Sequence, residues 1–144
     1  MKPSLIHRLR MRWFRFRHWN RVPHDIVIRR SGVVLKMRSN SPLAQAWYTG
    51  LGFEDGEIRC MVQHTSPGCR VIDVGANVGI YSVLLAEAAG ADGHVWCFEP
   101  TPEVALLLRE NVNRNRLGNV TVVEQAVTDS EGIVDLHVFG NGGD

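Results

Sequence analysis

The first hydrophobic pattern in the chain has the period of a helix and is interleaved with arginines. In the stretch LIHRLRMRWFRFRHWNR, helical spacing places Leu5, Leu9, Trp13 and Phe16 on one side, with the arginines mostly elsewhere around the helix. This pattern predicts an amphipathic basic helix. One interpretation is a helix that packs its aromatic side on the domain and leaves its arginines in solvent. The other is that residues 1–21 bind an anionic membrane surface, since Trp and clustered Arg favour such an interface. Binding to nucleic acid is a less favoured form of this interpretation.

The pattern then becomes strand-like for a short distance. Two β-branched runs, at residues 26–28 and 33–37, flank a Ser-Gly turn and predict a β-hairpin. The segment 40–53 is rich in turn residues, and its pattern supports no assignment. Apolar residues with helical spacing in 54–64, with carboxylates in the first turn, predict a short helix.

A regular alternation of short apolar runs and helical patterns begins at residue 71. The expected strands are 71–74, 94–98 and 120–123, of which 71–74 is expected to be buried. The expected helices between them are 80–89 and 102–116. Strands that alternate with helices at this spacing form right-handed crossovers and a parallel sheet with helices packed on it. The sequence therefore predicts an α/β fold with strand order 3-2-1. After a turn, residues 133–139 alternate between apolar and polar positions and predict a further, hairpin strand.

The composition of the 144 residues, with 44% hydrophobic and 22% charged, is that of a globular domain, and no apolar run approaches the length of a membrane span. Charge divides the chain unevenly. Residues 1–38 carry eleven Lys or Arg and one Asp, whereas the remainder carries five basic and fourteen acidic residues. We therefore expect two parts, a basic arm with the hairpin at 1–49 and an α/β part at 50–144. Without a secretory signal pattern, a cytoplasmic location is expected.

Candidate catalytic and metal-binding side chains are few. Cys60, Cys69 and Cys97 are odd in number and have no CxxC spacing, which favours reduced structural thiols over disulfides or a metal site. The histidines of the second part lie at helix ends or in strands, where we expect structural roles, and no catalytic base is identified; these are His64, His94 and His137.

The stretch VIDVGANVG carries the clearest chemistry, because a parallel sheet binds ligands at the carboxyl ends of its strands. Gly75 and Gly79 lie at such an end, but Asn77 replaces the middle glycine of the G-x-G-x-x-G pattern that binds dinucleotides. Asp73 would repel a pyrophosphate and suits a ligand with an ammonium or sulfonium group. This chemistry points to S-adenosylmethionine.

A second carboxylate supports the same ligand. Glu99 ends the second strand, 26 residues after Asp73, where an acidic side chain accepts hydrogen bonds from both ribose hydroxyls of an adenine nucleoside. Two strand-end carboxylates around one glycine turn predict a single nucleoside site. A nicotinamide oxidoreductase remains the alternative enzyme, and a basic-arm binding module on an α/β carrier remains the alternative of another class.

Four segments also carry a resemblance to a known family: VIDVGANVGIYSVLLA, CFEPTPE, LLRENVNRN and VVEQAVTDSEG. Over roughly residues 50–139, the chain resembles the FkbM family of S-adenosylmethionine-dependent methyltransferases. The resemblance implies a Rossmann-like class I fold with a seven-stranded sheet, and O-methyl transfer to a hydroxyl of a small molecule or sugar. It implies that the methionine portion lies among Asp73, Gly75, Asn77 and Gly79, and the ribose at Glu99. It further implies that Pro100 and Thr101 shape the turn beside the ribose, and that the adenine lies near Glu124, Gln125 and Ala126.

The chain departs from the family after its third strand. Members of the family continue into a fourth strand and three more, which supply most acceptor-binding groups, whereas this sequence ends at GNGGD. We therefore expect an incomplete fold whose strand 71–74 has an open edge able to pair with another chain. We also expect that this cofactor-binding half, without the rest of the fold, is deficient in catalysis.

Overall fold

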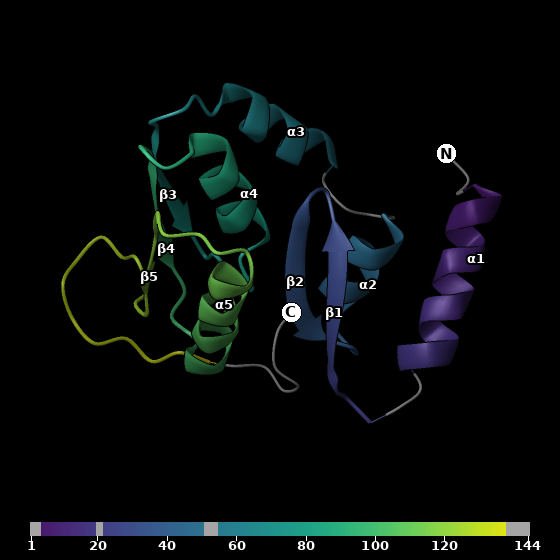
Figure 1. The fold of residues 1–144 in the computed structure, drawn as a ribbon. Helices are drawn as coiled ribbons and strands as arrows, with labels where there is room; N and C mark the ends of the chain where they lie inside the picture. Colours follow the sequence, from purple (N-terminus) through teal and green to yellow (C-terminus); the bar gives the residue numbers. More distant parts are fainter. Residues whose placement is uncertain (1–3, 20–21, 51–54, 138–144) are drawn as a thin grey trace.

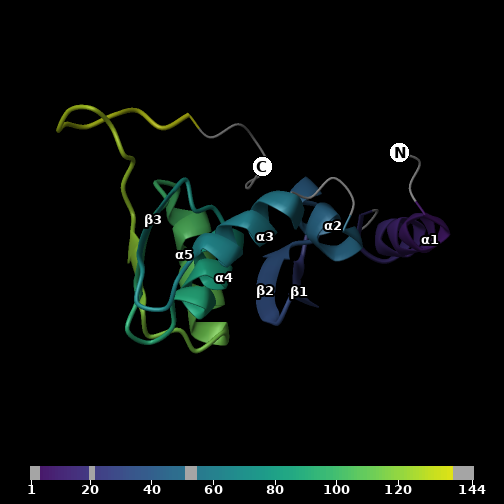
Figure 2. The same cartoon turned by 90° about the horizontal axis from the view of Figure 1, so that it is seen from above.

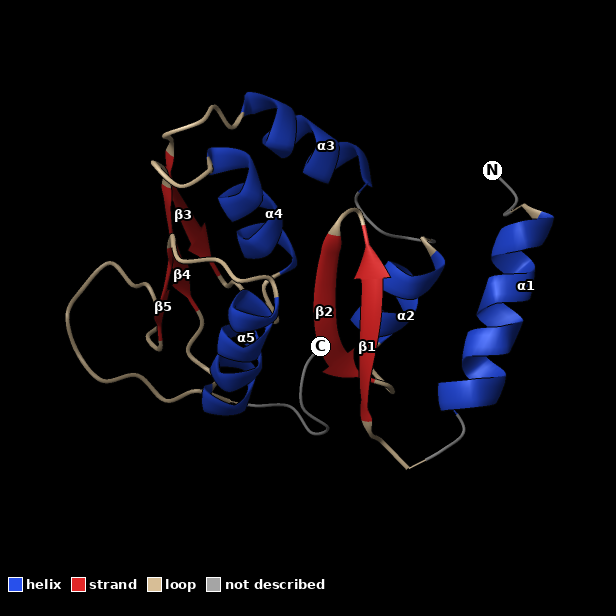
Figure 3. Ribbon diagram, in the orientation of Figure 1, coloured by secondary structure: helices blue, strands red, loops and turns tan. Residues whose placement is uncertain are grey.

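The computed structural model describes residues 4–19, 22–50 and 55–137. Figures 1 and 3 show its helices and strands, which alternate strictly from residue 55 to residue 123. In chain order they are α1 (Leu5–Phe14), the π-helical segment η1 (Arg15–Trp19), β1 (Asp25–Arg30), β2 (Val33–Arg38), α2 (Pro42–Thr49), α3 (Asp55–His64), β3 (Arg70–Val74), α4 (Ile80–Ala89), β4 (His94–Phe98), α5 (Pro102–Arg114) and β5 (Val120–Val123).

Strands β3, β4 and β5 form a parallel sheet in the order β3-β4-β5, which confirms the predicted α/β class and strand order. Val71 lies opposite Val95, and Cys97 lies opposite Val122. The predicted bounds of α4, β4 and β5 agree with the structure, and β3 begins one residue earlier than expected. Apolar runs of this length, separated by glycine-terminated helices, leave little freedom in where each element begins.

The prediction that β3 is buried is wrong for one of its faces. Ile72 and Val74 are 68% and 59% exposed, whereas Val71 and Asp73 on the other face are partly buried. Figure 2 shows the reason: helices α3, α4 and α5 all lie on the same side of the sheet. Among the described residues β3 is an edge strand, as expected. Pairing of that edge with another chain stays a prediction.

The predicted strand at 133–139 is not found where the structure describes it. Residues 133–137 are irregular and exposed, and the last two positions lie outside the described residues. An alternating pattern specifies a strand only when a neighbouring strand and a core face are available to it. Residues 124–137 instead form an irregular, curved loop that follows β5 (Figure 1).

The predicted hairpin is confirmed, with β1 antiparallel to β2. Both turn residues have positive φ, 53° for Ser31 and 87° for Gly32, as a two-residue turn that matches the strand twist requires. Hairpin residues such as Leu35 belong to the same hydrophobic cluster as Val83 of α4 and Trp47 of α2. Elements on both sides of residue 49 therefore share a core. The division into 1–49 and 50–144 stays a prediction.

Helix α2 was not predicted, although its capping residues are present in the sequence. The Ser41 side chain accepts hydrogen bonds from the backbone N–H groups of Leu43 and Ala44, and Pro42 occupies the first turn. Gly50 ends the helix with φ 73°. Ser, Pro and Gly are both turn residues and helix-cap residues, so they did not distinguish an eight-residue helix from turns, and the pattern of 40–53 supported no assignment.

Helix α1 forms as predicted, and part of its aromatic side packs on the domain, as one of the two interpretations expected. Phe14 is the buried residue of α1, and Trp13 stacks on Tyr48 of α2. Leu5, Leu9 and Phe16 are exposed. Within the described ranges, none of the helices combines the length and the apolar character that crossing a bilayer requires.

Candidate functional site

The connection between β3 and α4, residues 75–79, is called the glycine loop below. Gly75, Asn77 and Gly79 all have positive φ, at 76°, 50° and 89°. The backbone N–H groups of Gly75 and Ala76 donate to the carbonyl of Phe98 at 2.9 and 3.0 Å. These bonds fasten the loop to the carboxyl end of the neighbouring strand β4, where parallel sheets bind ligands.

Glu99 clamps the glycine loop from the end of β4. Its side chain is buried, with 7% of the residue exposed. Carboxylate oxygen Oε2 accepts a hydrogen bond from the Asn77 N–H at 3.0 Å, and Oε1 accepts one from the Thr101 N–H at 2.9 Å. The structure therefore brings together Asn77, Glu99 and Thr101, and half-buried Pro100 lies between the last two in the chain. Thr101 occupies the N-cap position of α5, but its side chain makes no capping hydrogen bond.

The two predicted glycines have different physical roles. A Cβ atom added at Gly79 would overlap the Cδ1 methyl of Leu108, a fully buried residue of α5, so Gly79 permits the loop to pack closely on that helix. A Cβ atom added at Gly75 would have no atom within 4 Å. Gly75 therefore leaves its backbone open on the outer side of the loop, where a ligand can approach it.

This difference predicts unequal effects of two alanine substitutions. Gly79→Ala is expected to destabilise the protein by about 2–4 kcal/mol, because strain at positive φ adds to overlap with Leu108. Gly75→Ala is the matched control and is expected to cost about 1–2 kcal/mol from strain alone. Urea unfolding followed by circular dichroism measures both. Equal losses in the two variants would contradict the packing role of Gly79.

Asp73 is directed toward α4. The Ser82 hydroxyl of α4 donates to Asp73 Oδ2 at 2.5 Å, and burial raises the pKa of the Asp73 carboxyl. Cys97 pairs with Asp73 across the sheet, and burial raises the pKa of its thiol to about 11. The structure thus places Asp73 in a small polar cluster beneath the glycine loop. Cys97, like Cys60 and Cys69, is a free thiol, as predicted.

Gln125 and Ala126 line a cavity of about 720 Å³ beyond the strand ends. Val74 and Phe98, the last residues of β3 and β4, line it as well, together with part of the segment 127–134. Neither Asp73 nor Glu99 lines this cavity. Gln125 and Ala126 therefore lie at the same end of the sheet as the glycine loop, but on its open face. Glu124, the third residue predicted near the adenine, does not line the cavity and pairs with Arg109 of α5 at 3.3 Å.

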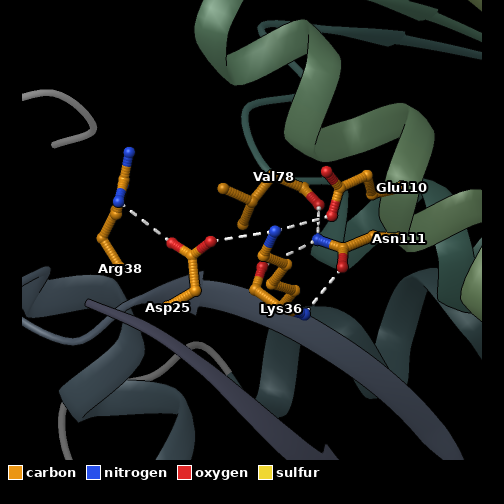
Figure 4. Close-up of polar contacts among 6 residues, drawn as sticks. All are labelled: Asp25, Lys36, Arg38, Val78, Glu110 and Asn111. Carbon is orange, nitrogen blue, oxygen red and sulfur yellow. Dashed lines mark hydrogen bonds and ion pairs between the residues drawn. The ribbon is translucent and has the colours of Figure 1, made fainter.

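Asn111 of α5 is a residue of this region that the sequence reasoning missed. It is fully buried, and its Nδ2 donates to the Val78 carbonyl in the glycine loop at 2.8 Å and to the Lys36 carbonyl at 3.0 Å. Its Oδ1 accepts from the Lys36 N–H at 2.6 Å. Figure 4 shows Asn111 between the loop and the hairpin. The available signal was a polar residue beside Leu108 and Val112 on the apolar stripe of the helix.

Asn115, the C-cap residue directly after α5, makes the same kind of contact. Its Nδ2 donates to the Val34 carbonyl, and its Oδ1 accepts from the Val34 N–H, both at 2.8 Å. Asn111 and Asn115 thus hydrogen-bond the N–H and the carbonyl of Lys36 and of Val34, which are alternate residues of β2. A neighbouring strand would pair with the same backbone groups. Helix α5 connects the hairpin to the glycine loop in this way.

Ion pairs reinforce the same contact at the surface. Lys36 Nζ lies 2.9 Å from Asp25 and 2.8 Å from Glu110 of α5, and Arg38 lies 3.1 Å from Asp25 (Figure 4). The hydrogen bond from Lys36 lowers the pKa of the Asp25 carboxyl. These partly exposed pairs contribute little individually, so the buried asparagines are the stronger connection.

The histidines lie away from the strand ends that carry the site. His94 begins β4, at the opposite end of that strand from Glu99, and its Nε2 is 2.8 Å from the Thr121 hydroxyl. His64 ends α3, and its ring contacts the Cys60 carbonyl at 2.7 Å. His137 is exposed in the irregular C-terminal segment. Their expected structural roles stay predictions. No cluster of metal-ligating side chains is found in the residues described.

Comparison with curated proteins finds methyltransferases. No family model matches the chain. A protein-L-isoaspartate O-methyltransferase of Aeropyrum pernix is 34% identical over 126 residues, which covers 71% of this chain and 48% of the relative. The 31-O-demethyl-FK506 methyltransferase FkbM of Streptomyces tacrolimicus is 37% identical over 78 residues, which covers 52% of this chain and 29% of the relative. The chain thus spans less than half the length of either relative.

These relatives support the methyltransferase interpretation over the oxidoreductase alternative. The FkbM protein is one of several methyltransferase relatives that are named for different acceptors. The comparison therefore supports a methyltransferase, and assignment to the FkbM family stays a proposal.

Solved structures show the same fold. TYW2 of M. jannaschii, in complex with AdoMet, aligns with a TM-score of 0.52 at 20% identity, which covers 69% of this chain and 42% of that chain. The chain therefore has the Rossmann-like class I fold of S-adenosylmethionine-dependent methyltransferases.

Proposed function

We propose that this chain binds S-adenosylmethionine at the carboxyl ends of β3, β4 and β5 and serves methyl transfer to an oxygen acceptor. The observation that carries the proposal is the clamp in which buried Glu99 holds the Asn77 and Thr101 N–H groups beside the open backbone of Gly75. A buried carboxylate at the end of the second strand, next to a glycine loop that begins a helix, suits a nucleoside.

Each residue of the clamp has a role in the proposed binding. A carboxylate has about four acceptor positions, and Glu99 uses two of them on backbone N–H groups, so two are left for the ribose hydroxyls. Gly75 lets the methionine portion approach the backbone. Gln125 and Ala126, in the cavity beyond β5, would contact the adenine, and Pro100 fixes the turn beside the ribose.

Bound S-adenosylmethionine supplies an electrophilic methyl group on a sulfonium. In the proposed transfer, the acceptor oxygen would form the new bond to the methyl carbon, the sulfur would keep the electron pair of the broken bond, and the proton of the acceptor hydroxyl would pass to solvent water. The residues described above contribute by holding the nucleoside in one orientation, which is most of what such a transfer requires of a protein.

The acceptor is proposed to be a hydroxyl of a small molecule or a sugar, as membership of the FkbM family would imply. The relative of Aeropyrum pernix is named for O-methyl transfer to a protein, which supports oxygen as the acceptor atom. Assays with radiolabelled cofactor should therefore include sugar and polyol hydroxyls, with an isoaspartyl peptide as the comparison.

Calorimetric titration with S-adenosylhomocysteine tests the cofactor proposal. A folded sample is expected to bind this product, whereas NADH is expected to give no heat beyond dilution. A folded sample that does not bind S-adenosylhomocysteine, or that binds NADH instead, would overturn the assignment.

Two variants at the polar cluster test whether Asp73 acts by charge. Asp73→Asn keeps an oxygen that accepts the Ser82 hydrogen bond but removes the charge, whereas Ser82→Ala keeps the charge and removes the bond. If Asp73 attracts the sulfonium, Asp73→Asn should weaken the binding of S-adenosylmethionine by about tenfold. The binding of S-adenosylhomocysteine, which has no sulfonium, should weaken by less. Ser82→Ala should then bind nearly as the wild type does. Equal loss for both ligands and both variants would assign Asp73 a purely structural role.

A further inference from the structure

Helix α1 and the segment η1 present large apolar side chains to solvent. Leu5, Ile6 and Leu9 of α1 are 63%, 69% and 54% exposed, and Phe16 of η1 is 79% exposed. Leu5 and Leu9 are one helical turn apart and lie on the same side of α1. We call Leu5, Ile6, Leu9 and Phe16, with the flanking arginines, the outer face of α1.

The opposite side of α1 is already used for packing, which fixes the direction of the outer face. Phe14 is fully buried and lies about 180° around the helix from Leu5, at about 100° per residue. The centre of its ring lies 5.2 Å from that of Tyr48 of α2, and the ring of the preceding residue, Trp13, stacks on the same tyrosine at 5.8 Å. The helix therefore cannot turn its leucines inward without losing Phe14 from the core.

The charge of this region has one sign. Residues 1–24 contain seven Lys or Arg and no acidic residue. Five arginines of α1 and η1 are exposed, and they flank the apolar side chains on both sides: Arg8, Arg10, Arg12, Arg15 and Arg17. Two of them lie over aromatic rings, Arg10 over Tyr48 at 5.2 Å and Arg17 over Trp13 at 5.3 Å, which holds their guanidinium groups beside the helix.

We propose that the outer face of α1 binds an anionic membrane surface, with the helix lying in the plane of the interface. The apolar side chains enter the boundary between headgroups and acyl chains, and the arginines on either side contact lipid phosphates. Three exposed aliphatic side chains between the arginines favour a lipid surface over nucleic acid, since a phosphate backbone offers them nothing to pack against. This role is separate from the cofactor site and would place the methyltransferase fold beside a membrane.

Sedimentation of the 144-residue protein with vesicles tests the proposal. Binding is expected to vesicles that contain phosphatidylglycerol and not to vesicles of pure phosphatidylcholine, and added salt should weaken it. The double variants Leu5→Ser/Leu9→Ser and Arg8→Gln/Arg12→Gln should each reduce binding by about tenfold or more.

Matched controls come from α5. Leu106 is 60% exposed and Arg114 is exposed, so Leu106→Ser and Arg114→Gln make the same chemical changes on another helix. Both should bind vesicles as the wild type does, and circular dichroism should show all variants folded.

Three results would overturn the proposal. The first is no partition of the wild type onto anionic vesicles. The second is vesicle binding that the serine variant retains, which would mean adsorption by charge without apolar insertion. The third is oligonucleotide binding that the arginine variant loses and the serine variant keeps, which would assign the face to nucleic acid. None of these results depends on whether S-adenosylhomocysteine binds.

Discussion

Replacing Glu99 with alanine is expected to weaken the binding of S-adenosylhomocysteine by about thirtyfold or more and to lower the free energy of unfolding by about 2–4 kcal/mol. The carboxylate holds the Asn77 and Thr101 N–H groups from a buried position, so its removal leaves both donors unpaired. The proposed ribose contacts are charge-assisted hydrogen bonds and would be lost at the same time. Calorimetry measures the affinity, and urea unfolding measures the stability.

The ligand itself can separate these two roles of Glu99. If the carboxylate binds the ribose, the wild type should prefer 5′-methylthioadenosine over its 2′-deoxy analogue, and Glu99→Ala should lose that preference. If Glu99 only clamps the loop, the variant should lose affinity for both nucleosides and keep the preference. Glu87→Ala is the matched control, because Glu87 is exposed on α4. An unchanged affinity in Glu99→Ala would contradict both roles.

Replacing Asn111 with alanine is expected to destabilise the protein by about 3 kcal/mol. The side chain is fully buried and bonds the Lys36 N–H, the Lys36 carbonyl and the Val78 carbonyl, and each of these groups would be left without this partner. Unsatisfied buried backbone groups cost about 1–3 kcal/mol each, reduced where water can enter the space. Because Val78 belongs to the glycine loop, the variant should also bind S-adenosylhomocysteine more weakly.

Two residues of the same helix serve as comparisons for Asn111. Asn113 is exposed on α5, so Asn113→Ala should change stability by less than about 0.5 kcal/mol. Asn115 bonds Val34 from a half-buried position, so Asn115→Ala should lie between the two. Thermal or urea unfolding orders the three variants. Similar stability of Asn111→Ala and Asn113→Ala would refute the bridge between hairpin and loop.

The elements of the parallel sheet could be predicted because their signals are local. Helix α4 and strands β4 and β5 have the predicted bounds, since apolar runs of the correct length lie between glycines and capping residues. Helix α2 was missed for a related reason: Ser41, Pro42 and Gly50 have the same local preferences in a turn as at the ends of a helix. Contact with the core, which buries Trp47, decides between the two.

The candidate site was predicted in part. Glycine spacing and the strand-end carboxylate located Glu99, Asn77 and Gly75 in one region, and the structure joins Glu99 and Asn77 directly. The direction of Asp73 toward Ser82 could not be read from spacing, because a strand residue faces one side or the other according to which helix covers the sheet. Asn111 was missed because its partners are 75 and 33 residues away in the chain.

By itself, the sequence determined the order and type of the sheet elements, the loop conformation that glycine permits, and the placement of an acidic residue at the end of β4. These properties depend on backbone preferences and apolar periodicity within a few residues. Only the tertiary structure decided which faces are covered: one side of β3 open, Phe14 rather than Leu5 buried in α1, and the edge of β2 satisfied by asparagines of α5. Burial depends on which distant segment arrives to exclude water, and no local pattern encodes the identity of that segment.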